Sequence, residues 1–211
     1  MMNPKVKNIL EWTYCIVIAI VIAIAVKYFI GTPTVVKQTS MKDTLVEGQR
    51  LWLNRWIRTV KGEYEIGDII TFEAPSVTYP SLSNIDFNNP VAEYNYTPKT
   101  LGGKFVYYVL ETNKTSYIKR IIGVAGDKIK IEDGKVYRNG KKVEEYYLAK
   151  GIETNGKTFS DITVPENCVF VMGDNREAST DSRDFGCIPI NKIESRVAFR
   201  FWPLNKFGKI D

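Results

Sequence analysis

The chain has 211 residues, 44% of them hydrophobic, with 29 Lys and Arg against 24 Asp and Glu and no histidine. This composition is that of a folded domain with a sizeable core, and its basic residues form no dense run, so we predict no nucleic-acid partner. Without histidine, Ser/His/Asp and Cys/His catalytic relays are excluded, and acid–base chemistry must come from Lys, Asp, Glu or Tyr. We predict neither a metal nor another cofactor.

Residues 9–30 form an apolar run, ILEWTYCIVIAIVIAIAVKYFI, whose two charges, Glu11 and Lys27, lie near its ends. About 22 helical residues span roughly 33 Å, enough to cross the hydrocarbon core of a bilayer. Aromatic residues lie near both ends, as they do at membrane interfaces. The run therefore predicts a single transmembrane helix, with the lipid bilayer as a partner.

Two other interpretations of this run stay open. A buried pair of strands is disfavoured because no turn residue interrupts the run. A cleavable signal peptide is suggested by Ala23-Ile24-Ala25, which has the small-x-small form of a cleavage site. The apolar residues continue to Ile30 without a helix breaker, which favours a retained anchor.

The charges beside the run predict its orientation. Lys5 and Lys7 precede it, and the positive-inside rule then places residues 1–8 in the cytoplasm. Residues 31–211 would form an extracytoplasmic domain. We therefore expect a single-pass protein of the cell membrane.

Beyond the helix, short β-like runs alternate with turn residues. Asp133-Gly134 and Asn139-Gly140 are the residue pairs that type I′ hairpin turns require, so residues 128–143 predict a three-strand meander. The fold class that we predict is mainly β, a barrel or sandwich with a polar insertion or long loop at residues 74–100. Further strands are predicted at residues 50–54, 68–72, 104–111, 117–123, 169–172 and 196–201.

Three segments could carry chemistry. In the first, QTSMKDTL, Ser40 and Asp43 fit the Ser-x-x-Asp motif that caps a helix, and alone this favours a cap over a nucleophile. In the second, YIKRIIGVAGD, Lys119 and Arg120 face opposite sides of a strand, so one cation shares a face with apolar residues. A lysine turned among those residues would have a lowered pKa and could act as a base, but this segment alone favours a lysine whose amine reaches solvent.

The third segment, residues 173–186, reads GDNREASTDSRDFG. A solvated loop is one interpretation. A calcium loop is another, although the usual order of acidic residues is absent. Packed between strands, this segment could instead orient a catalytic amine. Cys168 and Cys187 flank it, and the sequence leaves a disulfide between them open.

Together, SMxxTL, YIKRIIGxxGD and GDNRxxSxDSRxxG behind a membrane helix resemble the bacterial type I signal peptidases of the Gram-positive type. Residues 67–72, GDIITF, are similar to a further box of that family. The resemblance implies a membrane-bound serine endopeptidase that removes signal peptides from exported preproteins after a small-x-small site such as Ala-x-Ala. Those signal-peptide-bearing preproteins would be its partners.

The resemblance also implies roles for individual residues. Ser40 would be the nucleophile and Lys119 the general base of a Ser/Lys dyad. Ser179 would orient the lysine, while Asp181 and Arg183 would hold the third segment in place.

Two residues depart from the family pattern. Gln38 stands where the family has Gly or Ser, a position that contributes to the oxyanion hole in the Ser-bearing members; its amide could donate instead. Asp43 replaces the Pro of SMxPTL, and its carboxylate would raise the pKa of Lys119 if it pointed inward. A weak or inactive membrane-tethered assembly or chaperone-like protein of the same fold is the alternative function. A third alternative, a self-cleaving peptidase of the repressor type with a Ser/Lys pair, is disfavoured by the membrane helix and by the absence of a DNA-binding segment.

Overall fold

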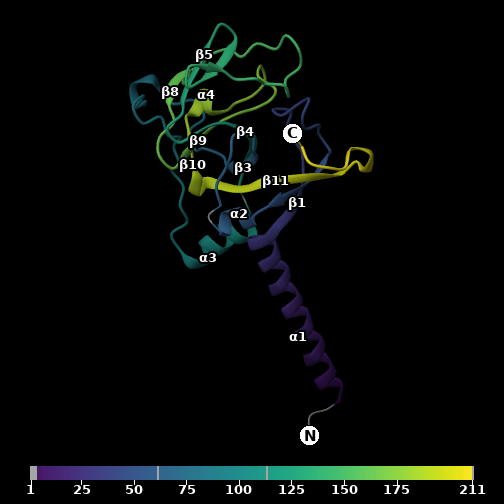
Figure 1. Cartoon of the computed structure of the whole chain (residues 1–211). Helices are drawn as coiled ribbons and strands as arrows, with labels where there is room; N and C mark the ends of the chain where they lie inside the picture. Colours follow the sequence, from purple (N-terminus) through teal and green to yellow (C-terminus); the bar gives the residue numbers. More distant parts are fainter. Residues whose placement is uncertain (1–3, 61, 113, 211) are drawn as a thin grey trace.

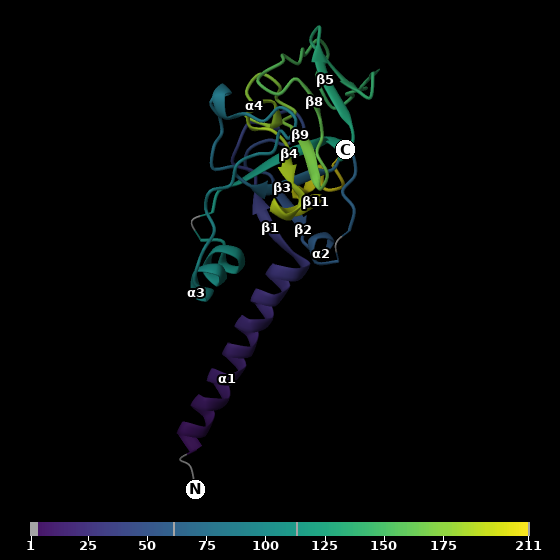
Figure 2. The ribbon, with the colours of Figure 1, turned by 90° about the vertical axis from the view of Figure 1, so that its left-hand side faces the viewer.

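The computed structural model describes residues 4–60, 62–112 and 114–210. Helix α1 (Pro4–Ala25) continues as a π-helical turn, η1 (Val26–Ile30), and projects from the β domain as a long rod (Figures 1 and 2). Lys5–Ile30 is long and apolar enough to cross a membrane, and its most apolar window is unburied. The strand-pair interpretation is therefore wrong. Residues 1–3 of the predicted N-terminal segment lie outside the described residues.

The rest of the described chain is mainly β, as predicted, and forms two antiparallel sheets. The larger has the order β1-β2-β11-β3-β4-β9-β10 and the smaller the order β7-β6-β5-β8. The strands are β1 (Gly31–Val35), β2 (Arg50–Asn54), β3 (Ile69–Glu73), β4 (Ser116–Val124), β5 (Lys128–Glu132), β6 (Lys135–Arg138), β7 (Lys141–Lys142), β8 (Asp161–Thr163), β9 (Cys168–Met172), β10 (Ile188–Pro189) and β11 (Ile193–Trp202).

Short helical turns connect the strands. They are α2 (Trp56–Thr59), η2 (Leu82–Asn84), α3 (Leu101–Phe105), η3 (Val106–Leu110), α4 (Ser182–Phe185), η4 (Ile190–Lys192) and η5 (Leu204–Lys206). The predicted meander is confirmed: Asp133, Gly134, Asn139 and Gly140 all have positive φ, between 49° and 77°, as type I′ turns require.

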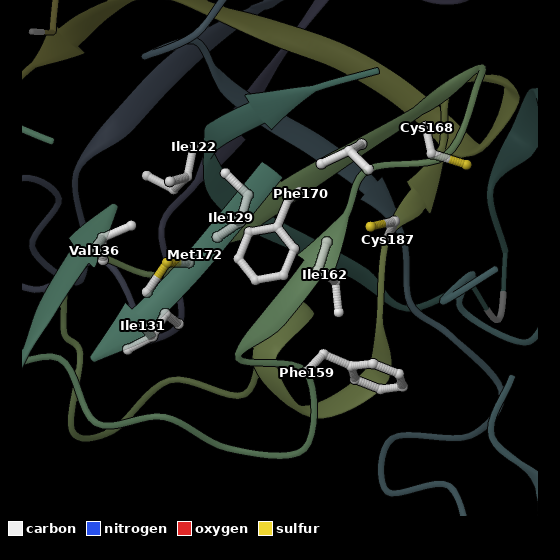
Figure 3. Close-up of a cluster of buried hydrophobic side chains, with 11 residues drawn as sticks. Ile122, Ile129, Ile131, Val136, Phe159, Ile162, Cys168, Phe170, Met172 and Cys187 are labelled. Carbon is white, nitrogen blue, oxygen red and sulfur yellow. The ribbon is translucent and has the colours of Figure 1, made fainter. Parts of the chain in front are cut away.

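The main core lies between the two sheets. Ile122, Phe170 and Met172 of the larger sheet pack against residues of the smaller sheet that include Ile129 and Ile162 (Figure 3). The flanking cysteines, Cys168 and Cys187, are buried free thiols in this cluster, and the disulfide that the sequence left open is not formed.

A second core cluster lies beneath the segment that contains Ser40. Met41 and Leu45 pack there with Leu51 and Leu53 of β2, and all four are buried. This packing fixes the turn that follows β1. The helix-cap interpretation of Ser40 and Asp43 is wrong, because residues 40–44 form turns and no helix follows.

The strand predicted at residues 104–111 is also wrong, because residues 104–110 belong to the helical turns α3 and η3. Thr100 caps α3 by accepting a hydrogen bond from the Gly103 N–H at 3.0 Å. The run KFVYYVLE is apolar without a clear period, so its pattern could not separate a strand from a helix. The excursion between β3 and β4 consequently spans residues 74–115, and we call it the β3–β4 segment.

Candidate active site

Ser40 and Lys119 are 79 residues apart in the sequence and meet in the fold. Ser40 lies in the turn after β1, whereas Lys119 lies in the middle of β4. The Lys119 Nζ atom donates a hydrogen bond to Ser40 Oγ at 2.7 Å and another to the Ile118 carbonyl at 3.2 Å. Ser40 is 8% exposed and Lys119 2% exposed. The structure thus brings a hydroxyl and an amine together in a dry environment.

Burial changes the chemistry of this amine. It removes water from the charged form and lowers the pKa of Lys119 from 10.5 to about 8, although the negative charges of Asp181 and Asp174 act in the opposite direction. A minor fraction of the amine is therefore neutral near physiological pH, where an unperturbed lysine has almost none. A neutral amine can take a proton from a hydroxyl, and an ammonium cannot.

The neighbouring cation, Arg120, faces the other side of β4 and has a structural partner. Its guanidinium forms a buried ion pair with Asp174, with an Nη2–Oδ2 distance of 2.9 Å, and stacks 4.0 Å from the centroid of the Tyr147 ring. Thr44 donates a further hydrogen bond to Asp174 at 2.6 Å. Asp174 therefore joins the SMxxTL turn, strand β4 and the third segment.

The third segment is largely buried, so the solvated-loop interpretation is wrong. Asp181 caps α4 and accepts hydrogen bonds from Arg183 Nε and Nη2, both at 2.9 Å, and from the Gly173 N–H at 3.0 Å. Burial acts to raise the pKa of Asp181, but the hydrogen bonds and charge of Arg183 hold it below its usual value. Arg183 also donates to the Arg176 carbonyl at 2.9 Å. These contacts form a rigid support beside Lys119.

Ser179 is buried in this support and lies against Gly173. A Cβ atom at Gly173 would overlap Ser179 Oγ and come within 2.5 Å of the Ser40 carbonyl oxygen, so only glycine permits this approach. The Ser179 hydroxyl makes no hydrogen bond of good geometry within the described part of the chain, although it lies close enough to Asp181 to help lower the pKa of that carboxyl.

Asn175 also positions the Ser40 turn, and sequence reasoning missed it. Its backbone N–H donates to the Ser40 carbonyl at 3.0 Å, and its side-chain amide donates to the Thr39 carbonyl at 3.1 Å. Its place in the GDN sequence of the third segment was the available clue, because that segment was already a candidate support for the site.

Comparison with known proteins identifies the family. Residues 9–202 match the family model described as signal peptidase, peptidase S26. The chain belongs to this family. Membership makes it a serine peptidase, and the predicted resemblance to the Gram-positive type I signal peptidases is confirmed.

Relatives cover nearly the whole chain. It is 32% identical to signal peptidase I of Bacillus licheniformis over 98% of this chain and 96% of that protein. It is 33% identical to signal peptidase I S of Bacillus subtilis, with coverage of 97% and 95%, and 31% identical to signal peptidase IB of Staphylococcus aureus, with coverage of 95% and 93%. A crystal structure of a signal peptidase I from Enterococcus faecalis aligns with 24% identity and a TM-score of 0.40, covering 64% of this chain and 97% of that one.

The two departures from the signal-peptidase pattern are both exposed. Asp43 has a φ of 83°, which proline cannot adopt because its ring fixes φ near −65°. This turn therefore differs from one built on Pro. The carboxylates that act most on Lys119 are those of Asp181 and Asp174. Gln38 is exposed two residues before Ser40.

Gln38 and Ile118 line a cavity of about 580 Å³, and they precede Ser40 by two residues and Lys119 by one; Ser40 and Lys119 themselves are not among its lining residues. One wall comes from β1 and the residues after it, and the other from the first residues of β4, up to Ile118. Strand β1 is the edge of the larger sheet, and the β9 partner of β4 begins only at Arg120. Strand β1 pairs only with β2, and the first residues of β4 pair only with β3, so each wall has one edge whose backbone groups are not paired within the sheet.

Proposed function

We propose that this signal-peptidase family member removes N-terminal signal peptides from exported proteins, with Ser40 as nucleophile and Lys119 as general base. The observation that carries the proposal is the 2.7 Å contact between Lys119 Nζ and Ser40 Oγ, both buried. The pKa of about 8 for Lys119 leaves about a tenth of the amine neutral at pH 7, where an unperturbed lysine has almost none.

The chemistry follows from that contact. Neutral Lys119 takes the Ser40 hydroxyl proton as Oγ attacks the scissile carbonyl. The resulting ammonium then gives its proton to the leaving amine, and an ester to Ser40 remains. Water hydrolyses this ester, again with Lys119 as base, and restores both residues.

The oxyanion that forms during attack needs hydrogen-bond donors. We assign the Ser40 N–H as one donor and the side-chain amide of Gln38 as the second, because Gln38 lies exposed two residues before Ser40 and lines the 580 Å³ cavity. Removing one such donor typically costs about 100- to 1,000-fold in rate. Gln38→Ala tests the assignment, because an unchanged kcat would remove Gln38 from the oxyanion hole.

The remaining site residues support the dyad. We assign Ser179 the role of orienting the Lys119 amine, since its buried hydroxyl lacks a hydrogen bond of good geometry in the described part of the chain. Asp181 and Arg183 hold the third segment, and Asn175 holds the backbone of Ser40.

The cavity fits an extended peptide. A substrate strand between β1 and β4 would pair with the unpaired backbone of both walls, as in recognition by strand addition. Alternate residues of a strand face the same side, so the first and third residues before the cut would point toward the same wall. This arrangement fits cleavage after a small-x-small sequence.

We further propose that residues 9–30 anchor the protein in the cell membrane, with residues 1–8 in the cytoplasm and residues 31–211 outside. The support is the apolar, unburied helix and the position of Lys5 and Lys7 before it. Protease added to intact cells should degrade the β domain and spare an N-terminal tag. The reverse pattern would overturn this topology, and loss of the tag from the mature protein would favour a cleaved signal peptide.

Purified full-length protein in detergent should cleave a preprotein after its small-x-small site. Ser40→Ala and Lys119→Met should each abolish turnover with the fold intact, whereas Lys141→Met, at an exposed lysine on β7, should leave turnover unchanged. Full activity in either variant would exclude the Ser40–Lys119 dyad as the catalytic machinery. An inactive but folded wild-type protein would favour the assembly or chaperone-like alternative.

A further inference from the structure

The last part of the β3–β4 segment exposes apolar side chains on a helical turn. Leu101 is 87% exposed and Phe105 47% exposed, and Val106 and Leu110 are similarly uncovered. Soluble surfaces seldom group large apolar residues in this way, because each square ångström left in water costs about 25 cal/mol. Within the described part of the chain, α3 and η3 therefore carry an uncovered apolar surface.

These turns lie at the end of the β domain from which α1 projects. Both views place α3 level with the upper turns of α1 (Figures 1 and 2). Lys27, in η1, donates a hydrogen bond to the Leu110 carbonyl at 3.3 Å and pairs with Glu111 at 3.4 Å. Arg55 pairs with the same carboxylate at 2.6 Å. The end of η3 is thus fixed to the last turn of the apolar helix.

The exposed end of the apolar helix continues this surface. Val26, Phe29 and Ile30 of η1 are exposed at the point where Lys27 holds η3. Ten helical residues extend about 15 Å, too short to cross a bilayer but long enough to lie along its surface. Tyr107 and Tyr108 are half-buried and Lys104 is exposed, a combination of aromatic and basic residues that suits the headgroup region.

We propose that α3 and η3 lie in the outer interface of the lipid bilayer, as a second membrane contact beside α1. The inference rests on the proposed membrane anchor. A bilayer is favoured over a bound peptide because the apolar residues continue the exposed surface of the anchor helix.

This contact would also fix the position of the 580 Å³ cavity relative to the bilayer. A cleft of about 740 Å³ separates α3 and η3 from the β domain, and it shares Thr115 and Tyr117 with the 580 Å³ cavity. With α1 and η3 both in the membrane, the cavity opens at the bilayer surface. There the apolar part of a membrane-inserted signal peptide gives way to its cleavage site.

Site-specific fluorescence in lipid vesicles tests the contact. In full-length protein with Cys15→Ser, the thiols of Cys168 and Cys187 are buried, so a cysteine introduced by Phe105→Cys can be labelled with an environment-sensitive dye. Val17→Cys labels the middle of α1. Tyr146→Cys labels a residue that is 82% exposed and follows β7, a strand of the smaller sheet, which lies away from α1 (Figure 1). Vesicles of phosphatidylcholine and phosphatidylglycerol carry doxyl quenchers at shallow or deep positions.

We expect shallow quenchers to quench the label at position 105, deep quenchers to quench the label at position 17, and neither to affect position 146. Quenching at 17 without quenching at 105 would overturn this inference and leave the anchor standing. No quenching at 17 would overturn the anchor and the inference together. Shielding at 105 only after addition of a signal peptide would assign the surface to substrate and overturn the lipid contact.

A cleavage assay adds a functional readout. The double variant Leu101→Ser, Phe105→Ser should cleave a preprotein inserted in vesicles at least about tenfold more slowly, yet hydrolyse a short soluble peptide at the normal rate. Leu82→Ser is the matched control, since Leu82 is 72% exposed in the same β3–β4 segment but outside α3 and η3. Equal loss on both substrates, or equal loss in the control, would contradict a membrane contact.

Discussion

Two irregular regions of this molecule, residues 173–186 and the β3–β4 segment, have opposite physical characters. The first is largely buried, and its buried charged groups are paired, among them Asp181 with Arg183 and Asp174 with Arg120. The second carries its apolar side chains outward on α3 and η3. Residue type alone therefore does not predict burial: a polar loop can be buried and held by ion pairs, and an apolar run can be exposed.

The charged groups explain the difference. A buried carboxylate is stable only when donors surround it, and Asp181 has three hydrogen bonds from Arg183 as well as the Gly173 N–H. The outward face of α3 and η3 has no such network in the described residues, and its environment must come from elsewhere.

Removing the central pair should have the largest effect on stability. Arg183→Met leaves Asp181 buried without its main partner, and we expect the free energy of unfolding to fall by about 3–5 kcal/mol. Lys104→Met, on the exposed α3, should change it by less than about 0.5 kcal/mol. Denaturant unfolding of both variants measures the difference. Similar losses in the two variants would remove the contrast between the regions.

Burial of the Lys119 amine beside this network lowers the stability of the fold, because burial disfavours the charged form of the amine. An unfolded chain binds the Lys119 proton up to pH 10.5 and the folded chain only up to about pH 8, so stability rises as the pH increases from 8 to 10.5. Lys119→Met should remove this rise and stabilise the protein near pH 7 by about 3 kcal/mol. Unfolding curves at pH 7 and pH 10.5 provide the measurement, and Lys141→Met, at an exposed lysine on β7, is the control. A destabilised Lys119→Met variant would show that the amine is not held at a lowered pKa.

The same titration should govern catalysis. If neutral Lys119 is the working base, kcat/KM for a soluble peptide rises about tenfold per pH unit well below pH 8 and levels off above it, so that the rise from pH 6 to pH 8 is about 50-fold. A pH–rate profile from pH 5.5 to 9.5 measures this. A flat profile, or one that falls toward pH 8, would exclude Lys119 as the base.

Much of this architecture was predictable from sequence, because its patterns are local. Alternating residues gave the meander, and the order of three motifs led to the family and to Ser40 and Lys119. The contacts of Asn175 and Thr44 were not predictable, because they depend on partners more than 100 residues away. Strand β1 was missed because Gly31 and Pro33 end helices in most contexts, and an edge strand tolerates both. Residues 104–111 were assigned wrongly because their apolar run has no clear period.

Two glycine substitutions give the finest comparison of the regions, because they add the same methyl group to each. At Gly173 the new Cβ would overlap the Ser179 hydroxyl and press on the Ser40 carbonyl, so Gly173→Ala should lower the free energy of unfolding by about 1–3 kcal/mol and slow turnover.

At Gly102, in α3, a Cβ meets nothing within 4 Å. Gly102→Ala should therefore leave turnover unchanged and stabilise the protein by up to about 1 kcal/mol, since alanine favours the helix. Thermal unfolding and peptide hydrolysis of the two variants measure both effects. If Gly173→Ala were as active and stable as Gly102→Ala, residues 173–186 would have room to move, and their rigid support of Lys119 would be refuted.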